Sequence, residues 1–418
     1  MRQSIISLFV KFFGALVSYA LTGYISFFLG NEKLGYFSFF LSYSLIFTLI
    51  MKFGTDIFMM KWVSRYTAMG EDGKAKYLYL RLIWYHFIIG LLISVLAFWV
   101  TPFIIVQFFP SYTDYVFFQI AIFSVFFVNL HIMHYEFLRG KQKVVAYTFY
   151  HAASIFLLTI IFLVLQDFVG FDSDRKLEIS YLAATICSLM LSSFQVWRNI
   201  KDTVINPIKE YRIWHTLKSS FPFFSNNAVF ILIGTLDIFI LSKYIEPEVV
   251  GEYALMLKFA GFVSFPLVVI GANFSPKIIS ISDRDILQKK ISRLTLGITL
   301  GALFIFLLIL PIIPYLKLYL HIKHIAVYKI FILVALGYIF SAACALNEVC
   351  LMMLGEEKLY QKIMFAALIL NFVLNLLLIP AFKELGAAIT TCITLVCWNI
   401  TAVYFAKKKL NLSTSILN

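Results

Sequence analysis

The segment LGNEKLGYFSFFLSYSLIFTLIMKFGTDIFMMK (Leu29–Lys61) places a short polar break and a glycine ahead of a long apolar run. A helix needs about 20 apolar residues to cross the ~30 Å hydrocarbon core of a bilayer, and this run is long enough. Near its end the run contains Lys52, Gly54 and Asp56, and it closes on a basic loop. Charges inside such a run indicate a membrane helix with one side turned toward protein or water.

The pattern returns later in the chain as YIEPEVVGEYALMLKFAGFVSFPLVVIGANFSPK (Tyr244–Lys277). Gly35 then aligns with Gly251 at an offset of 216. An independent echo aligns Gly140, in LRGKQK, with Gly355, in LGEEK, at an offset of 215. Two matches at almost the same offset predict one structural unit used twice.

Composition identifies an integral membrane protein. Of the 418 residues, 61% are hydrophobic and 14% are charged, whereas a soluble domain has about 45–50% apolar and about 25% charged residues. The net charge of +13 is expected to face anionic lipid headgroups rather than nucleic acid. The five cysteines lie in apolar runs without a C-x-x-C pair, so we expect neither a disulfide framework nor a metal site, and no cofactor. The apolar N-terminus is interpreted as a retained helix rather than a signal peptide.

The apolar runs predict an all-α polytopic protein with twelve transmembrane helices, because they are too long for the strands of a membrane barrel. The expected spans are 5–29, 34–60, 79–101, 115–137, 144–165, 179–197, 220–243, 250–275, 294–314, 326–353, 359–381 and 384–406. The expected organisation is an N-terminal six-helix bundle (1–200), a cytoplasmic linker (201–219) and a C-terminal six-helix bundle (220–418). An even number of spans per half places the halves in parallel orientation.

The distribution of lysine and arginine predicts that both termini are cytoplasmic. With the N-terminus inside, the inner connections contain 24 of these residues and the outer connections 8, which follows the positive-inside rule.

Buried charges are the candidate substrate-binding residues, because ionisable groups in a membrane are costly and face a cavity or a partner. Lys52 lies about 12 Å deep by helical rise, with Asp56 on the same face at i,i+4. This pair either neutralises itself or presents a cation to a water-filled cavity. Lys258, in the repeat-related span, has no acid three or four residues away, and Asp237 in span seven is its expected partner. Lys11, in span one, is a weaker candidate because it can snorkel to the cytoplasm.

Glu136 and Glu348, near the inner ends of the repeat-related spans four and ten, are candidates for ion or proton coupling, although a partly solvated helix end is an equal alternative. His131 and His134 share a helix face at i,i+3, which suits half a metal site, but no other clustered ligands support one, and a structural or pH-sensing role is favoured. The sequence contains no Walker loop, no HExxH and no GxSxG, so we expect no enzyme.

Three passages resemble one family. They are the loop Leu29–Tyr36, the close Phe53–Asp56 of span two, and Leu236–Leu241 continuing to Glu248–Tyr253 with the pattern D-x-x-x-L followed by G-x-Y. With twelve spans in a six-plus-six repeat, the chain resembles the polysaccharide-biosynthesis (Wzx-type O-antigen) flippases of the multidrug/oligosaccharidyl-lipid/polysaccharide flippase superfamily.

The resemblance implies a V-shaped bundle of two halves, embedded in the lipids of the bacterial cytoplasmic membrane. It implies that the protein flips an undecaprenyl-diphosphate-linked oligosaccharide, an O-antigen or capsule repeat unit, by alternating access. A polymerase and a chain-length regulator of the same pathway are expected partners. Two alternatives stay open: a multidrug ion-coupled antiporter, for which an acid-dominated cavity is expected, and a membrane polysaccharide polymerase, for which a large external loop is expected.

Overall fold

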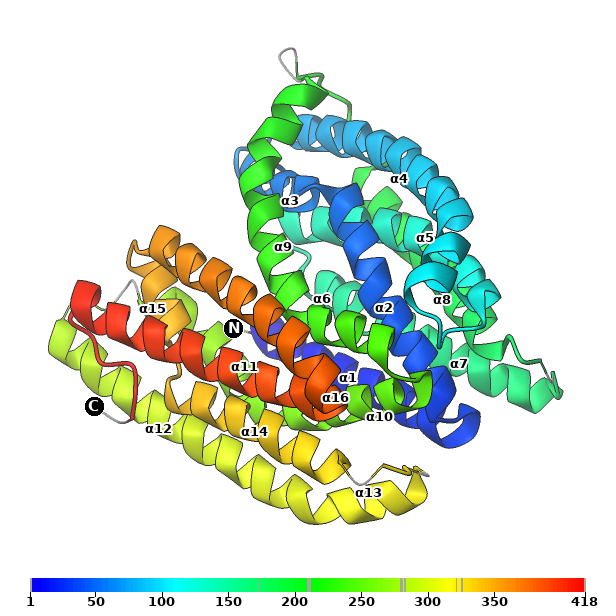
Figure 1. Ribbon diagram of the computed structural model, residues 1–418. Helices are drawn as coiled ribbons and strands as arrows, with labels where there is room; N and C mark the ends of the chain where they lie inside the picture. The colour runs from blue at the N-terminus through cyan, green and yellow to red at the C-terminus, as the bar shows by residue number, and fades with distance from the viewer. Residues whose placement is uncertain are drawn as a thin grey trace. The chain divides into compact units, whose positions relative to one another are not determined.

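The computed structural model describes residues 2–171, 173–208, 212–278, 281, 283–320, 322–324 and 326–416. All regular structure in this part of the chain is helical (Figure 1). The elements of the first half, in chain order, are α1 (Arg2–Tyr24), the π-helical turn η1 (Ile25–Leu29), α2 (Asn31–Lys52), α3 (Thr55–Ala68), α4 (Asp72–Phe108), α5 (Tyr115–Gly140), α6 (Val144–Ala152), α7 (Ser154–Val169) and α8 (Lys176–Ile200).

The second half begins with a helix of 32 residues that carries Pro222 inside it. Its elements are α9 (Ile213–Tyr244), α10 (Pro247–Gly261), the 3-10 turn η2 (Phe262–Ser264), α11 (Phe265–Ile278), α12 (Arg284–Ile309), the 3-10 turn η3 (Leu310–Ile312), α13 (Ile313–Tyr319), α14 (Val327–Ala343), α15 (Asn347–Met353) and α16 (Glu357–Leu410). The expected all-helical membrane fold is confirmed.

The number of membrane spans depends on how the bent helices are counted. Within the described residues, nine helices are long and apolar enough to cross a membrane, or eleven if two sharply bent helix pairs each count as one span. The helix α16 contains a non-helical residue, Lys383, at φ 54° and ψ −131°, which matches the break expected between 381 and 384. The expected count of twelve is not confirmed by these criteria.

Two spans expected to be continuous helices are interrupted. Span two breaks between α2 and α3, where Phe53 and Gly54 have φ values of 45° and 76°. Span eight breaks at the η2 turn before Pro266, because proline cannot donate its backbone nitrogen to the helix ladder. Two further bends, 50° between α6 and α7 and 47° between α14 and α15, contain no proline.

The chain forms two compact units. Unit 1 comprises Met1–Tyr24 and Phe40–Ile231, and unit 2 comprises Ile25–Phe39 and Leu232–Asn418. In unit 1, α5 packs against α4 and α8 (Figure 1). In unit 2, α14 packs against α10, α12 and α16. The division into functional halves at the linker 201–219, of which 209–211 lie outside the described residues, stays a prediction.

The two glycines that the sequence repeat aligns lie at one helix crossing in unit 2. The helices α2 and α10 begin at Asn31 and Pro247, with the same offset of 216 that relates Gly35 to Gly251. A Cβ atom on Gly35 would lie 1.7 Å from the carbonyl oxygen of Pro247, and one on Gly251 would lie 2.1 Å from that of Asn31. Gly35 on α2 therefore packs against the start of α10, and Gly251 on α10 packs against the start of α2. Small residues at these positions allow the two backbones to approach closely.

The second echo is not matched in conformation. Gly355 adopts a left-handed φ of 93°, whereas in the first half the left-handed residue is Gln142. Gly140 instead ends α5, where an added Cβ would lie 2.8 Å from Val63. Gly140 and Gly355 are aligned in the sequence repeat, but a close helix contact favours glycine at the first position and a left-handed backbone favours it at the second.

Candidate functional site

The break between α2 and α3 is built around Gly54. A Cβ atom there would lie 2.4 Å from the carbonyl oxygen of Ser220 and 2.5 Å from the backbone nitrogen of Phe224, both on α9. Its left-handed φ of 76° also favours glycine. The neighbouring Phe53 stacks on Phe224 at a centroid distance of 4.7 Å. The break is therefore imposed by close packing against α9.

Lys52 and Asp56 lie on opposite sides of this break. Their Nζ and Oδ2 atoms are 3.1 Å apart, and the side chains are 12% and 5% exposed. Lys52 is in the last turn of α2 and Asp56 in the first turn of α3, so each charge also complements a helix end. Removing one partner of a buried pair costs about 3–5 kcal/mol, because the other charge is left uncompensated.

The backbone at the break is braced by neighbouring helices. The Thr55 hydroxyl lies 2.6 Å from the carbonyl oxygen of Lys52 and 2.7 Å from Nε2 of His86. The Nδ1 atom of His86 is 3.1 Å from Oδ1 of Asn129. Residues on α4 and α5 thus hold the position of Lys52. The second carboxylate oxygen of Asp56, Oδ1, is buried and accepts no hydrogen bond from the part of the chain that the structure describes.

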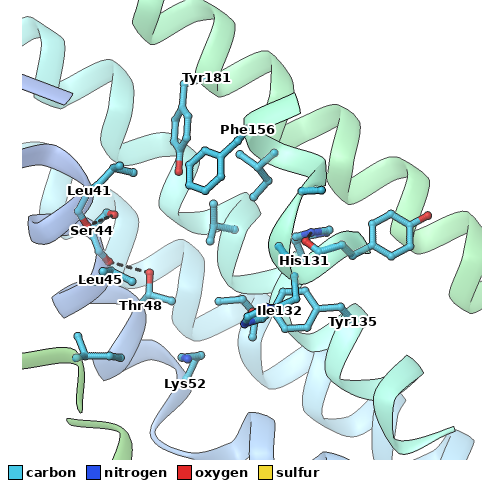
Figure 2. Close-up of a pocket in the computed structure, with 17 residues that line it drawn as sticks. Leu41, Ser44, Leu45, Thr48, Lys52, His131, Ile132, Tyr135, Phe156 and Tyr181 are labelled. Carbon is cyan, nitrogen blue, oxygen red and sulfur yellow. Dashed lines mark hydrogen bonds between the residues drawn. The ribbon is translucent and has the colours of Figure 1, made fainter. Parts of the chain in front are cut away.

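A cavity of about 350 Å³ opens beside Lys52 in unit 1 (Figure 2). Ser44, Thr48 and Lys52 line it from α2, and His131 and Tyr135 line it from α5. Tyr181 and Phe156 lie at the end opposite Lys52 (Figure 2). The remaining lining is Leu41, Leu45, Val128, Ile132, Tyr150, His151, Ala152, Ala153, Ile155 and Ile231. One cation thus stands at the edge of a pocket that is otherwise aromatic, apolar and hydroxyl-bearing.

The sequence of α2 carries a signal for this wall of the cavity. Ser44, Thr48 and Lys52 are spaced four residues apart, so they share one face of α2. The hydroxyls of Ser44 and Thr48 donate to the carbonyl oxygens of Leu41 and Ser44, at 2.9 and 2.8 Å. A polar stripe at helical spacing in an apolar run therefore marks the cavity side of the helix.

His131 and His134 connect α5 to neighbouring helices of unit 1 through hydrogen bonds. Their Nδ1 atoms lie 2.9 and 3.1 Å from the hydroxyl of Ser192 on α8. Nε2 of His131 is 3.1 Å from the carbonyl oxygen of Tyr150. No group of three or more histidine, cysteine, aspartate or glutamate side chains suited to a metal occurs among the described residues.

The other candidates in unit 1 differ in their surroundings. Lys11 on α1 is exposed. Glu136 is buried and lies 3.3 Å from NH1 of Arg139, whose guanidinium is 4.9 Å from the ring centre of Tyr147. A carboxylate paired with an arginine can be structural, so the coupling role expected of Glu136 stays a prediction.

In unit 2, Asp237 and Lys258 lie on different helices. The carboxylate of Asp237 accepts from the hydroxyl of Tyr253 and from the backbone nitrogen of Ile238, both at 2.8 Å. Lys258 is in the last turn of α10, just before the η2 turn. Its expected pairing with Asp237 stays a prediction.

The two lysines occupy different positions in the repeat. Lys258 comes two helical turns after its repeat glycine, Gly251, whereas Lys52 comes almost five turns after Gly35. At 1.5 Å per residue, Lys258 lies about 15 Å nearer the start of its helix than Lys52 does. Each lysine lies in the last turn of its own helix, but the two lysines are not at equivalent positions of the repeat.

Glu348 lies in the first turn of α15 and is exposed to a second pocket. This pocket belongs wholly to unit 2. Neither of these two pockets is lined by all the candidate residues.

The sequence profile of the family described as "Polysaccharide biosynthesis protein" matches residues 1–281, about two thirds of the chain. The chain belongs to this family. It is a multi-pass membrane protein, with the helical fold found in flippases and multidrug transporters. A comparison with curated proteins gives no match.

The chain is similar in structure to a solved lipid II flippase, MurJ, in an inward closed conformation. That likeness has a TM-score of 0.73 at 18% identity and covers 96% of this chain and 87% of MurJ. An inward-facing MATE family multidrug resistance transporter of the MOP superfamily gives a TM-score of 0.65 at 12% identity, covering 97% and 98% of the two chains. A mutant of the Vibrio cholerae MATE transporter VcmN gives 0.64 at 15% identity, covering 98% of each chain. These likenesses confirm the expected fold class.

Proposed function

We propose that this protein flips an undecaprenyl-diphosphate-linked oligosaccharide across the bacterial cytoplasmic membrane by alternating access, with both termini in the cytoplasm. The observation that carries the proposal is Lys52 at the edge of a cavity inside a membrane-spanning unit. A diphosphate crossing hydrocarbon needs a compensating cation, because an unpaired buried charge is prohibitively costly. The family membership supports a lipid-linked saccharide as the cargo.

Different groups in the cavity lining suit different parts of this cargo. Lys52 supplies charge for the phosphate, while Ser44 and Thr48 supply hydroxyl oxygens. Tyr181, Phe156 and Tyr135 supply aromatic surface, which packs against the apolar faces of a ligand. Asp56 keeps Lys52 paired until the anion arrives. The acid-dominated cavity expected of a cationic-drug antiporter is a poorer fit, because none of the described residues that line this pocket is a carboxylate.

The proposed function is tested in a strain that lacks the gene. We expect surface polysaccharide to disappear and the lipid-linked oligosaccharide to accumulate at the cytoplasmic face, because synthesis continues while transfer stops. Reintroducing the wild-type gene should reverse both effects. Both quantities are measured by polysaccharide gels and by mass spectrometry of extracted lipids. Unchanged polysaccharide in the deletion strain, together with altered drug resistance, would instead support the antiporter.

Topology gives a separate prediction, because the distribution of positive charge orients the chain. Single cysteines at Lys76 and Ser219 are expected to react with a membrane-impermeant maleimide only from the cytoplasm. A cysteine at Glu246 should react only from outside. The measurement is labelling of intact cells against inverted membrane vesicles. The opposite pattern would contradict the proposed orientation.

A further inference from the structure

The bend between α14 and α15 interrupts a membrane-spanning segment in unit 2. The helix α14 ends at Ala343, and α15 begins at Asn347 after a bend of 47°. Leu346 adopts a left-handed φ of 69°, which is costly for a branched residue and is maintained only where the surroundings require it. Such a break exposes backbone carbonyl groups that a continuous helix would have satisfied.

The protein itself occupies those carbonyl groups. Thr299 donates to the carbonyl oxygen of Ala342 at 3.1 Å, and Thr295 donates to that of Ala345 at 3.4 Å. The backbone nitrogen of Ile416, in the C-terminal segment, donates to the oxygen of Ala343 at 3.0 Å. The break is therefore not an open ring of carbonyl oxygens, which is the arrangement that a hard cation requires.

A pocket of about 320 Å³ opens beside the break. Its polar wall contains Glu348, Tyr360 and Asn347, and its other walls include the indole of Trp398 and the bare backbone of Gly271. The remaining lining is Leu267, Val268, Ser341, Cys344, Ala345, Leu346, Val349 and Asn399. The size is at the lower end of small-molecule sites, which range from about 300 to 1,000 Å³, and suits one sugar ring.

The polar groups of this pocket are held in place by one another. The amide nitrogen of Asn347 donates to Oδ1 of Asn399 at 2.8 Å, and that of Asn399 donates to Ser341 at 2.9 Å. The phenol of Tyr360 lines the pocket together with the carboxylate of Glu348. No ion pair of Glu348 occurs among the side chains that the structure describes. Its carboxylate is thus a fixed acceptor facing an open space.

We propose that this pocket is a saccharide-binding subsite of unit 2, which rests on the proposed function. The carboxylate of Glu348 accepts hydrogen bonds from neighbouring sugar hydroxyls, and the phenol of Tyr360 lies next to it. The indole of Trp398 offers an apolar face for the C–H side of the ring. A site built to hydrogen-bond hydroxyl groups discriminates strongly against a ligand that lacks them, so the subsite distinguishes the sugar-bearing lipid from the bare carrier.

Gly271 allows the pocket to be filled without disturbing the helix. Among the described residues, a Cβ atom there has one heavy atom within 4 Å, Cγ2 of Val349 at 4.0 Å, and leucine is a better helix former than glycine. Gly297 on α12 has no heavy atom within 4 Å of its added Cβ. Gly271→Leu therefore blocks the pocket, and Gly297→Leu is the same change on the same unit away from it.

The experiment measures binding to the purified full chain in lipid nanodiscs. The probes are the lipid-linked oligosaccharide extracted from the deletion strain and undecaprenyl diphosphate without sugar. We expect Gly271→Leu to weaken binding of the oligosaccharide lipid about tenfold, which corresponds to about 1.4 kcal/mol, and to leave the bare carrier unchanged. Gly297→Leu should bind both as the wild type does. Equal weakening of both probes, or of neither, overturns the subsite.

A charge-neutral variant separates the sugar from a coupling ion. Glu348→Gln keeps a carbonyl acceptor of similar shape, so a saccharide site should lose only a few-fold in affinity and keep transport. If Glu348→Gln abolishes transport while binding of both lipids is unchanged, Glu348 serves ion or proton coupling and the subsite is overturned. Failure of the deletion strain to accumulate any lipid-linked oligosaccharide would overturn the proposed function itself. Normal accumulation with a wild-type protein that binds both probes equally would overturn only the subsite.

Discussion

Replacing Lys52 by glutamine is expected to stop surface polysaccharide from appearing while leaving protein abundance near the wild-type level. The carboxylate of Asp56, 3.1 Å from Nζ in the native pair, stays in the first turn of α3, where the helix dipole favours a negative charge, and it can accept from the glutamine amide, so the loss of stability is expected to be smaller than for a fully uncompensated buried charge. The cavity loses its cation, and the diphosphate is no longer compensated. Lys52→Arg should restore part of the polysaccharide, because arginine keeps the charge but differs in size and hydration. Immunoblots of membranes and polysaccharide gels measure the two quantities.

The matched variants test whether charge rather than packing is responsible. Asp56→Asn should lower both abundance and polysaccharide, because it leaves Lys52 as an uncompensated buried charge. Lys258→Gln should act like Lys52→Gln if unit 2 also contributes a cation, and Asp237→Asn like Asp56→Asn. Normal polysaccharide in the Lys258→Gln strain would restrict the cationic site to Lys52. Normal polysaccharide in the Lys52→Gln strain would contradict the proposed role of the cavity.

Alanine at either glycine of the α2–α10 crossing is expected to destabilise the protein by about 1–3 kcal/mol, the usual cost of overpacking a close contact. The added Cβ would lie 1.7 Å from Pro247 in Gly35→Ala and 2.1 Å from Asn31 in Gly251→Ala. Both neighbours are backbone atoms, so the two helices must move apart. The measurement is the apparent Tm of the detergent-purified protein.

Two other glycines serve as controls for the crossing. An added Cβ at Gly23 or Gly297 meets no heavy atom within 4 Å. Gly→Ala in such a helix restricts the unfolded chain and is expected to raise stability slightly. If Gly35→Ala and Gly251→Ala leave the Tm as high as these controls do, the backbones are not in contact at this crossing. Loss of stability at both positions would support the reciprocal contact of the repeat.

The sequence alone determined the membrane character, the helical fold class and the register of the repeat. The reason is that lipid cannot satisfy backbone polar groups, so long apolar runs have few alternatives to helices. The shared offset that aligns Gly35 with Gly251 predicted a repeat, and the two glycines meet each other's helix starts in unit 2. The i,i+4 spacing predicted the pairing of Lys52 and Asp56, and the two side chains do meet at 3.1 Å, but across the break between α2 and α3 rather than on one continuous helix.

Only the tertiary structure decided where the chain breaks and what surrounds each buried charge. The break after Lys52 depends on the close approach of Ser220 and Phe224 of α9 to Gly54. These residues are far apart in the sequence, so no local sequence pattern predicts the contact. The same holds for Asp237, whose carboxylate accepts a hydrogen bond from the hydroxyl of Tyr253. The break beside the Glu348 pocket is likewise decided by distant contacts, because the hydroxyls of Thr295 and Thr299 and the backbone nitrogen of Ile416 donate to carbonyl oxygens there. The thickness of the lipid bilayer determines where helices occur along the chain, whereas packing between the helices determines which residues surround the site.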